Sequence, residues 1–285
     1  MRTMEEIREL DHERVLSLLP DRDPEGHKGT YGKILLLCGS RGYTGAAYLA
    51  AMGALRCGAG LVYLGVPESI YSIEAVKLNE PVVFPLPDDG GMYHPSACDE
   101  LRARVKGMDA VLIGCGMGQG RGPLAVLKMI LEEATCPVVL DADGINLLSG
   151  HMDLLRGRRS PTILTPHLGE FRRVTADGPD KTVSAVALAK ETGTVVLLKG
   201  HRTLVTDGDT VYRNPTGNPG MATGGSGDVL AGMIAALLGQ GIGPLEAAAC
   251  GAWLHGAAGD ICARELGQYA MLPSDMLEVL PRLLK

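Results

Sequence analysis

The chain has 285 residues, of which 46% are hydrophobic, so it has enough apolar material for a large core. Its net charge is −6 and no run of Lys or Arg appears, which excludes nucleic acid as a main partner. Gly, Pro or charged residues interrupt every apolar stretch before membrane-spanning length, and the N-terminus has no apolar signal region, so we expect no membrane contact. The seven cysteines occur singly, which predicts free thiols and a cytoplasmic location.

Buried strands, glycine-rich loops and helices alternate along the chain. Continuous apolar runs predict strands covered on both faces. These strands are expected at 33–38, 60–66, 109–113, 137–140, 162–164 and 195–198, with an edge strand at 81–84 and a hairpin at 204–212. Helices are expected at 11–19, 46–57, 101–106, 123–134, 184–191, 229–238, 245–264 and 273–283, and a further helix that contains Asn146 is expected after Gly144.

This alternation predicts an α/β fold with a central, mainly parallel sheet between two layers of helices. No low-complexity linker or change in composition divides the sequence, so we expect residues 1–285 to form one domain. Ligand loops should gather where the parallel strands end. No GxxxxGK[ST] motif follows the first strand, so phosphate binding is expected later in the chain.

The stretch from Asn214 to Gly241 has the composition of an anion-binding loop that leads into a helix. Consecutive glycines, Gly224, Gly225 and Gly227, allow backbone N–H groups to converge on one anion, and a helix N-terminus adds its dipole. Asp228 then lies beside the bound anion, where a carboxylate suits a general base better than a ground-state contact. The alternative is that Asp228 is only the N-cap of the helix.

Three other loops follow predicted strands and have both a functional and a structural interpretation. Asp141 ends the strand 137–140, where α/β sheets bind ligands, although the Asp143-Gly144 pair that follows is typical of a turn. His167 ends the strand 162–164, where ligand contact and a structural role are equally expected. The small residues 45–47 permit either close ligand approach or tight helix packing.

Several motifs together resemble the ADP/ATP-dependent NAD(P)H-hydrate dehydratases, which are members of the ribokinase-like superfamily. The matching segments are GTYGKILLLCGSRGYTGAAYLAAMGALRCGAGLV, LDADGINLL, LTPHLGE, LLKGHRT and NPTGNPGMATGGSGDVLAG. The resemblance implies a ribokinase-like α/β/α domain. It also implies an enzyme without the epimerase domain that some relatives carry fused in front, because residues 1–26 are too few for one.

The reaction that this resemblance implies is the repair of hydrated NADH and NADPH. A nucleotide phosphorylates the hydroxyl of the S-hydrate, and elimination of phosphate restores the dihydronicotinamide. The resemblance favours ADP over ATP as the donor and implies Mg²⁺ on the nucleotide phosphates, a homotetramer and a separate NAD(P)H-hydrate epimerase as a partner enzyme.

The resemblance also assigns roles to particular residues. Asp228 is expected to be the base, with Gly225, Ser226 and Gly227 donating N–H groups to the transferred phosphoryl group. Residues expected to contact the hydrated dinucleotide are Ala46, Gly116, His167 and Asp228. Those expected to bind the nucleotide are Lys199, Gly200, His201, Arg202, Thr203, Asn214 and Gly227.

Some features depart from the family pattern or leave other functions open. Glu170 takes the place of a magnesium-linked acid, but His167 precedes it where sugar kinases have Asn, so no protein ligand to a metal is expected. Cys115 stands where the family often has Pro, which leaves the rigidity of its loop open. The rival functions are a small-molecule kinase of the same fold, acting on a vitamin precursor or sugar, and a non-catalytic nucleotide sensor.

Overall fold

The computed structural model describes residues 7–175, 178 and 180–285. Residues 1–6, the part of the charged N-terminus in which no signal region was found, lie outside the described residues. The main sheet has nine strands in the order β11-β10-β9-β8-β7-β6-β1-β2-β3. The strands from β9 to β3 in this order pair in parallel, while β10 pairs antiparallel with β9 and β11. The prediction of a mainly parallel sheet is therefore confirmed.

The nine strands of the main sheet match the predicted positions closely, whereas the short antiparallel pair β4 and β5 was not predicted. In chain order the strands are β1 (Lys33–Leu37), β2 (Leu61–Pro67), β3 (Val82–Leu86), β4 (Asp88–Asp89), β5 (Met92–Tyr93), β6 (Ala110–Ile113), β7 (Val138–Leu140), β8 (Thr162–Leu164), β9 (Val195–Leu198), β10 (Leu204–Thr206) and β11 (Val211–Arg213). The strand β3 lies at the edge of the sheet and contains Pro85, as an edge strand can.

The helices include three that the sequence did not predict, α3, α7 and α8. In chain order they are α1 (His12–Leu18), α2 (Thr44–Arg56), α3 (Glu68–Lys77), α4 (Ala97–Arg104), α5 (Arg121–Glu133), α6 (Asp143–Asn146), α7 (Asp153–Arg156), α8 (Leu168–Val174), α9 (Lys181–Thr192), α10 (Ser226–Gly239), α11 (Pro244–Leu266) and α12 (Pro273–Leu283). A short 3-10 turn, Pro219–Met221, precedes α10.

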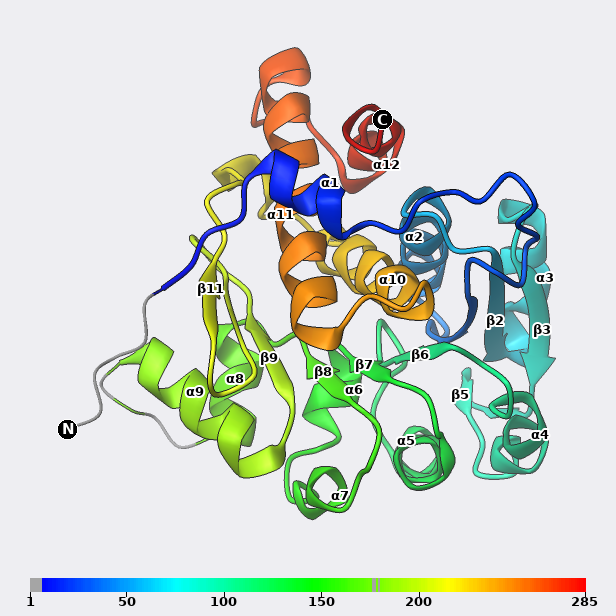
Figure 1. The fold of residues 1–285 in the computed structure, drawn as a ribbon. Coiled ribbons are helices and arrows are strands. Elements are labelled where there is room, and N and C mark those ends of the chain that lie inside the picture. Colours follow the sequence, from blue (N-terminus) through cyan, green and yellow to red (C-terminus); the bar gives the residue numbers. More distant parts are fainter. Residues whose placement is uncertain (1–6, 176–177, 179) are drawn as a thin grey trace.

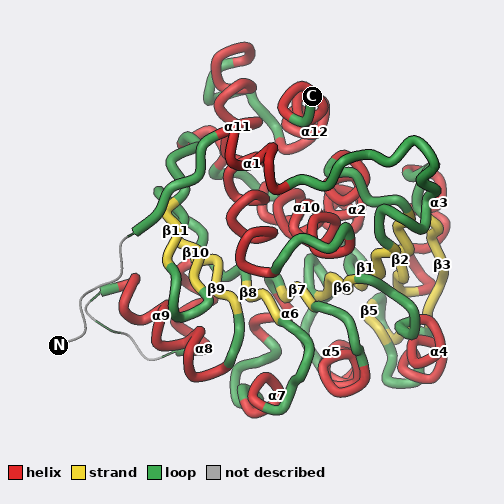
Figure 2. The backbone as a smooth tube through the Cα atoms, viewed as in Figure 1, coloured by secondary structure: helices red, strands yellow, loops and turns green. Residues whose placement is uncertain are grey.

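Helices cover both faces of the sheet (Figures 1 and 2). One face carries α2, α10, α11 and α12, and the other carries α4, α5, α7 and α9. The alternation of side chains along a strand divides the apolar residues between two cores. In β1, Ile34 and Leu36 belong to the first core, whereas Leu35 and Leu37 belong to the second. The three-layer α/β/α prediction is confirmed.

Helices α2 and α10 pack backbone to backbone through glycines. A Cβ built on Gly232 of α10 would lie 2.0 Å from the carbonyl oxygen of Ala50 in α2. In the opposite direction, a Cβ on Gly53 would lie 2.5 Å from the carbonyl oxygen of Val229. Only glycine fits at such contacts, so this pair of glycines sets the distance between the two helices. Since α10 also packs on β1, β6 and β7, the contact fixes the start of α10 above the ends of those strands.

Among the described residues, no helix has both the length and the apolar character that crossing a membrane would require.

Candidate functional site

Helix α10 begins at Ser226, three residues earlier than predicted, directly after the glycine cluster. Gly225 is its N-cap in a left-handed conformation, with φ 97°, and no side chain of the described residues caps the helix. The alternative that Asp228 is an N-cap is therefore wrong, because Asp228 lies within the first turn. No described side chain caps this turn, and the Ser226 N–H makes only a long hydrogen bond of 3.4 Å to the Thr223 carbonyl, so the turn can present N–H groups to an anion.

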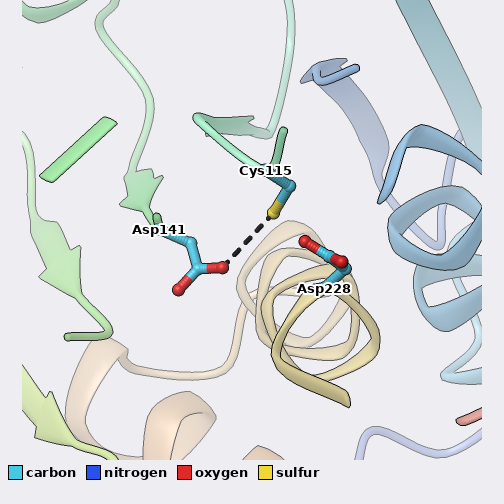
Figure 3. A group of neighbouring side chains, drawn as sticks. All are labelled: Cys115, Asp141 and Asp228. Atoms are coloured by element: carbon cyan, nitrogen blue, oxygen red, sulfur yellow. Dashed lines mark hydrogen bonds between the residues drawn. The ribbon is translucent and has the colours of Figure 1, made fainter. Parts of the chain in front are cut away.

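Three side chains from separate elements meet beside this turn (Figure 3). Cys115 follows β6, Asp141 follows β7 and Asp228 belongs to α10. One ligand atom of each, a thiol sulfur or a carboxylate oxygen, lies within 4.8 Å of the other two. Because β6 and β7 are parallel neighbours, their carboxyl ends place Cys115 and Asp141 on the same edge of the sheet, as predicted for ligand loops.

Asp141 is the most enclosed member of this cluster, with 1% of its surface exposed. Its Oδ1 accepts hydrogen bonds from the Lys199 ammonium at 2.6 Å and from the Thr165 hydroxyl at 2.7 Å. The Cys115 thiol donates to Oδ2 over 3.5 Å. Lys199 supplies the positive charge that a buried carboxylate needs as a partner, and the two hydrogen bonds from Thr165 and Cys115 occupy both oxygens of Asp141. Asp141 therefore forms an ion pair with Lys199 in addition to its place at the start of a turn.

Lys199 lies between two carboxylates at the end of β9. Besides the contact with Asp141, its Nζ is 3.9 Å from Glu170 Oε2. Burial alone would lower the pKa of Lys199, but the negative charges of Asp141 and Glu170 outweigh it and raise the pKa above its ordinary value. Lys199 therefore keeps its ammonium charge next to Gly227, whose Cβ position is 3.2 Å from Nζ. A side chain at position 227 would crowd this ammonium.

The environment of Asp228 differs from that of Asp141. Burial, followed by the charge of Asp141, raises the pKa of Asp228 to about 6, and the charge of Glu170 acts weakly in the same direction. A hydrogen bond with Cys115 and the charge of Lys199 oppose this increase. A carboxylate with a pKa of about 6 is ionised at neutral pH and accepts a proton more readily than an ordinary aspartate. The two neighbouring aspartates thus have different properties, one an ion-pair partner and one suited to proton transfer.

The glycine loop around Cys115 is held by its hydrogen bonds. Gly114 adopts φ 123° and Gly116 φ 58°, conformations that favour glycine. The N–H of Gly39 donates to the carbonyl of Cys115 at 2.8 Å, and the Ser40 hydroxyl donates to the carbonyl of Gly116 at 2.8 Å. These bonds fix the loop without the ring of a proline. A Cβ on Gly116 would lie 2.8 Å from the Cβ of Ala46, so the two residues predicted to contact the dinucleotide adjoin one another.

His167 is the N-cap of α8 and also faces open space. Its Nδ1 accepts hydrogen bonds from the N–H groups of Gly169 at 2.9 Å and Glu170 at 3.3 Å. The Glu170 carboxylate accepts from the N–H of His167 at 2.8 Å, which completes a reciprocal cap. Because Nδ1 is an acceptor, the ring proton is on Nε2. The His167 side chain is 57% exposed, so the structural role leaves the ring accessible to a ligand.

A cavity of about 710 Å³ opens beside the start of α10 and is large enough for a nucleotide. It adjoins the anion-binding turn through Ser226 and Gly227. Every residue predicted to bind the nucleotide lines it, namely Lys199, Gly200, His201, Arg202, Thr203, Asn214 and Gly227. Of the residues predicted to contact the dinucleotide, His167 lines this cavity, whereas Ala46, Gly116 and Asp228 are not among its lining residues. The residues predicted to bind the nucleotide therefore line one cavity, whereas three of the four residues predicted to contact the dinucleotide lie outside it.

His255 of α11 is a cavity residue to which sequence reasoning gave no role. Its Nε2 lies 2.9 Å from the carbonyl oxygen of Ser226 and 3.3 Å from the Ser226 hydroxyl. Burial lowers the pKa of His255 to about 4, so the ring is neutral and Nε2–H donates to that carbonyl. The contact supports the first turn of α10. The local sequence does not predict this contact, because Ser226 and His255 are 29 residues apart.

The cluster of Cys115, Asp141 and Asp228 does not fit a resident Mg²⁺. This ion takes oxygen ligands in octahedral geometry, and a protonated thiol is not one of them. The Asp141 carboxylate already accepts hydrogen bonds on both oxygens, and its negative charge is matched by Lys199. A Mg²⁺ ion that enters with nucleotide phosphates would belong to the substrate.

Comparison with known sequences identifies the family. A sequence model described as NAD(P)H-hydrate dehydratase matches residues 34–282. The chain belongs to this family. The match covers β1 through α12 and therefore every loop of the site. The resemblance inferred from the motifs is confirmed.

Individual relatives support the assignment to the NAD(P)H-hydrate dehydratases. The bifunctional NAD(P)H-hydrate repair enzyme Nnr of Moorella thermoacetica is 45% identical over 277 residues, which cover 94% of this chain and 52% of the relative. The chain thus spans about half the length of that curated relative. The crystal structure of the ADP/ATP-dependent NAD(P)H-hydrate dehydratase from Bacillus subtilis, co-crystallised with ATP/Mg²⁺, is 32% identical with a TM-score of 0.83 and covers 98% of each chain.

A further solved structure confirms the fold prediction. A ribokinase-like superfamily protein from Enterococcus faecalis V583 has a TM-score of 0.86 and 26% identity, covering 100% of this chain and 97% of that one. The fold is therefore ribokinase-like.

Proposed function

We propose that this chain is an ADP-dependent (S)-NAD(P)H-hydrate dehydratase, a carbon–oxygen lyase that restores NADH and NADPH from their hydrates. Family membership supports the proposal, as does the name ADP/ATP-dependent NAD(P)H-hydrate dehydratase of the Bacillus subtilis relative. The observation that carries it is the position of Asp228. Its carboxylate, with a pKa of about 6, lies in the first turn of an uncapped helix that borders a nucleotide-sized cavity.

Phosphoryl transfer is the first step that this arrangement supports. The nucleotide phosphates lie along the first turn of α10, where N–H groups of Gly225, Ser226 and Gly227 stabilise the transferred phosphoryl group. Asp228 accepts the proton of the ring hydroxyl as its oxygen attacks the terminal phosphorus and the shortened nucleotide leaves. The ammonium of Lys199 offsets negative charge at this point, since it stays protonated between Asp141 and Glu170.

Elimination then completes the reaction on the substrate itself. The nitrogen lone pair of the hydrated ring expels the phosphate, and loss of a ring proton restores the dihydronicotinamide. The net change is removal of water from the hydrate and hydrolysis of one phosphoanhydride. A kinase-like site is therefore sufficient for a dehydration, because the leaving group made in the first step departs with the help of the ring nitrogen.

The proposal is tested by mixing the protein with (S)-hydrated NADH and either ADP or ATP. We expect near-ultraviolet absorbance of the dihydronicotinamide to recover only when nucleotide is present, with release of one phosphate per ring restored. Comparison of the two nucleotides identifies the donor, and ADP is expected to be the better one. Failure of the absorbance to recover, together with phosphorylation of another alcohol, would instead indicate a small-molecule kinase. Nucleotide binding without any turnover would indicate a sensor.

The pKa of Asp228 predicts the pH dependence of this reaction. The base acts in its ionised form, so kcat/KM should be highest above the pKa of about 6 and decline as pH falls through it. Below that point each further pH unit should reduce kcat/KM by about tenfold. A pH–rate profile measures the midpoint, and nucleotide affinity measured at the same pH values shows whether binding follows the same curve. A profile that stays flat down to pH 4 would contradict the assignment of the base.

We further propose that the chain is a single-domain, cytoplasmic homotetramer that relies on a separate NAD(P)H-hydrate epimerase and takes its nucleotide with Mg²⁺. All seven cysteines are free, in keeping with a reducing compartment. The Moorella thermoacetica relative is named a bifunctional repair enzyme, which supports the need for a second activity, here assigned to a separate epimerase. The ATP/Mg²⁺ of the Bacillus subtilis crystal supports a magnesium nucleotide. Sedimentation measurements test the tetramer.

A further inference from the structure

The Cys115 thiol lies within reach of two carboxylates and has one proton to donate. Its sulfur is 3.5 Å from Asp141 Oδ2, and the sulfur and one oxygen of each aspartate all lie within 4.8 Å of one another. In Figure 3 the Asp228 side chain points toward Cys115 from the helix below, while Asp141 approaches from the neighbouring loop. The thiol and Asp141 are buried, whereas Asp228 is partly exposed.

The thiol remains a donor at neutral pH. A hydrogen bond with Cys38, followed by burial and the charges of Asp141 and Asp228, holds the pKa of Cys115 well above its ordinary range. It is therefore neither a thiolate nucleophile nor a metal ligand in this state. Its backbone is also fixed, because the carbonyl of Cys115 accepts a hydrogen bond from Gly39 at 2.8 Å.

Asp141 does not depend on this proton. Its Oδ1 already accepts from Lys199 and Thr165 at 2.6 and 2.7 Å. The contributions that favour ionised Asp228 are a hydrogen bond with Cys115 and the charge of Lys199. Rotation about the Cβ–Sγ bond can carry the thiol proton from Asp141 toward Asp228 without displacing any heavy atom.

We propose that Cys115 is a positioning residue whose S–H alternates between Asp141 and Asp228, holding the Asp228 carboxylate in place while it is ionised and releasing it when it has accepted a proton. The inference rests on the proposed role of Asp228 as the base. It gives a physical function to a buried thiol that the proposed reaction does not otherwise use.

The groups that face Asp228 set the direction of the expected effect. Asp141 and Glu170 carry charges that oppose ionisation of Asp228, whereas Lys199 and the hydrogen bond from Cys115 favour it. Loss of the thiol proton removes one of the two favourable contributions, so the pKa of Asp228 should rise above about 6. The acid limb of the pH–rate profile should move in the same direction.

The test compares Cys115→Ala, Cys115→Val and Cys115→Ser with wild type. Alanine and valine have no proton to donate, and valine retains most of the side-chain volume. In both variants we expect the acid limb to move up by about one pH unit, so that kcat/KM at pH 5 falls about tenfold while the value at pH 8 changes less than about twofold. Cys115→Ser keeps a donor and should return the limb to the wild-type position or below it. Cys136→Ala is the matched control, because Cys136 is also buried but lies outside the cluster, and its profile should not move.

A direct titration separates this inference from the proposed reaction. The carboxyl ¹³C resonance of Asp228, assigned by its loss in Asp228→Asn, reports protonation without any substrate. A higher midpoint in the alanine and valine variants, restored by serine, supports the role of Cys115 even if no dehydratase activity is found. An unchanged midpoint in both variants overturns it. A loss of activity that is equal at every pH, with no change in the midpoint, would indicate only a packing role and also overturns it.

Discussion

Asp228→Asn should reduce dehydratase turnover by about 10²–10⁴-fold while nucleotide affinity stays close to wild type. The amide has nearly the shape of the carboxylate but accepts no proton from the ring hydroxyl. The nucleotide cavity, which Asp228 does not line, should remain intact. Turnover is measured by recovery of the dihydronicotinamide absorbance, and affinity by calorimetric titration with ADP.

The same substitution should stabilise the fold at neutral pH. The pKa of Asp228 rises from 3.8 to about 6 in the folded chain, so the folded state binds the proton more tightly than the unfolded state. Ionised Asp228 therefore destabilises the fold, with a penalty that is absent below about pH 4, develops between about pH 4 and 6, and is complete above. Asparagine carries no charge, and we expect a gain on the order of 1–3 kcal/mol in the free energy of unfolding at pH 7.

An exposed aspartate provides the control for both measurements. Asp99 lies on α4 with its side chain 79% exposed, so Asp99→Asn should leave turnover and melting temperature unchanged. Near-normal turnover in Asp228→Asn would exclude Asp228 as the base. Lost turnover accompanied by a lower melting temperature would mean that the carboxylate supports the fold, which is opposite to the effect of its buried charge.

Gly232→Ala should destabilise the protein by about 2 kcal/mol or more, although alanine is the better helix former. The new methyl group would lie 2.0 Å from the Ala50 carbonyl oxygen and 3.0 Å from the backbone N of Ala54, and neither backbone atom can move aside alone. Helices α2 and α10 would have to separate, and the first turn of α10 would move with them. Thermal unfolding should show a decrease of at least about 4 °C.

The control for this effect is another helical glycine. Gly45 in the first turn of α2 has no atom within 4 Å of its Cβ position. Gly45→Ala should therefore leave stability unchanged or raise it by about 0.5–1 kcal/mol, through helix propensity and reduced freedom of the unfolded chain. A similar loss of stability in both variants would mean that the close packing of α2 on α10 does not decide the result.

Most of the fold could be predicted because its strands are continuous apolar runs that end in glycine or polar loops. The helices that were missed lack clear signals. α3 buries only Ile70 and Glu74, so it shows little apolar periodicity. α8 is seven residues long and is capped by His167, which is not one of the side chains usually expected at an N-cap.

The parts of the candidate site that are formed by residues adjacent in sequence could be predicted. The glycine cluster, Asp228 and the Lys199–Thr203 segment are adjacent residues with a recognisable composition. The contact between Lys199 and Asp141 spans 58 residues and joins strands that are separated by β8, so it depends on the strand order of the finished sheet. The position of Asp141 at a strand end could be predicted, whereas its ion pair and its neighbour Cys115 required the three-dimensional arrangement.

The late position of α10 has a consequence for synthesis on the ribosome. This helix, Ser226–Gly239, covers α2 and strands β1, β6 and β7, all of which are translated by residue 140. Until α10 emerges, the face formed by Ala47, Ala50 and their apolar neighbours has no cover, and contacts this distant in sequence form slowly. A growing chain should therefore bind chaperones during this interval. The segment that supplies the proposed base, Asp228, also covers this apolar face.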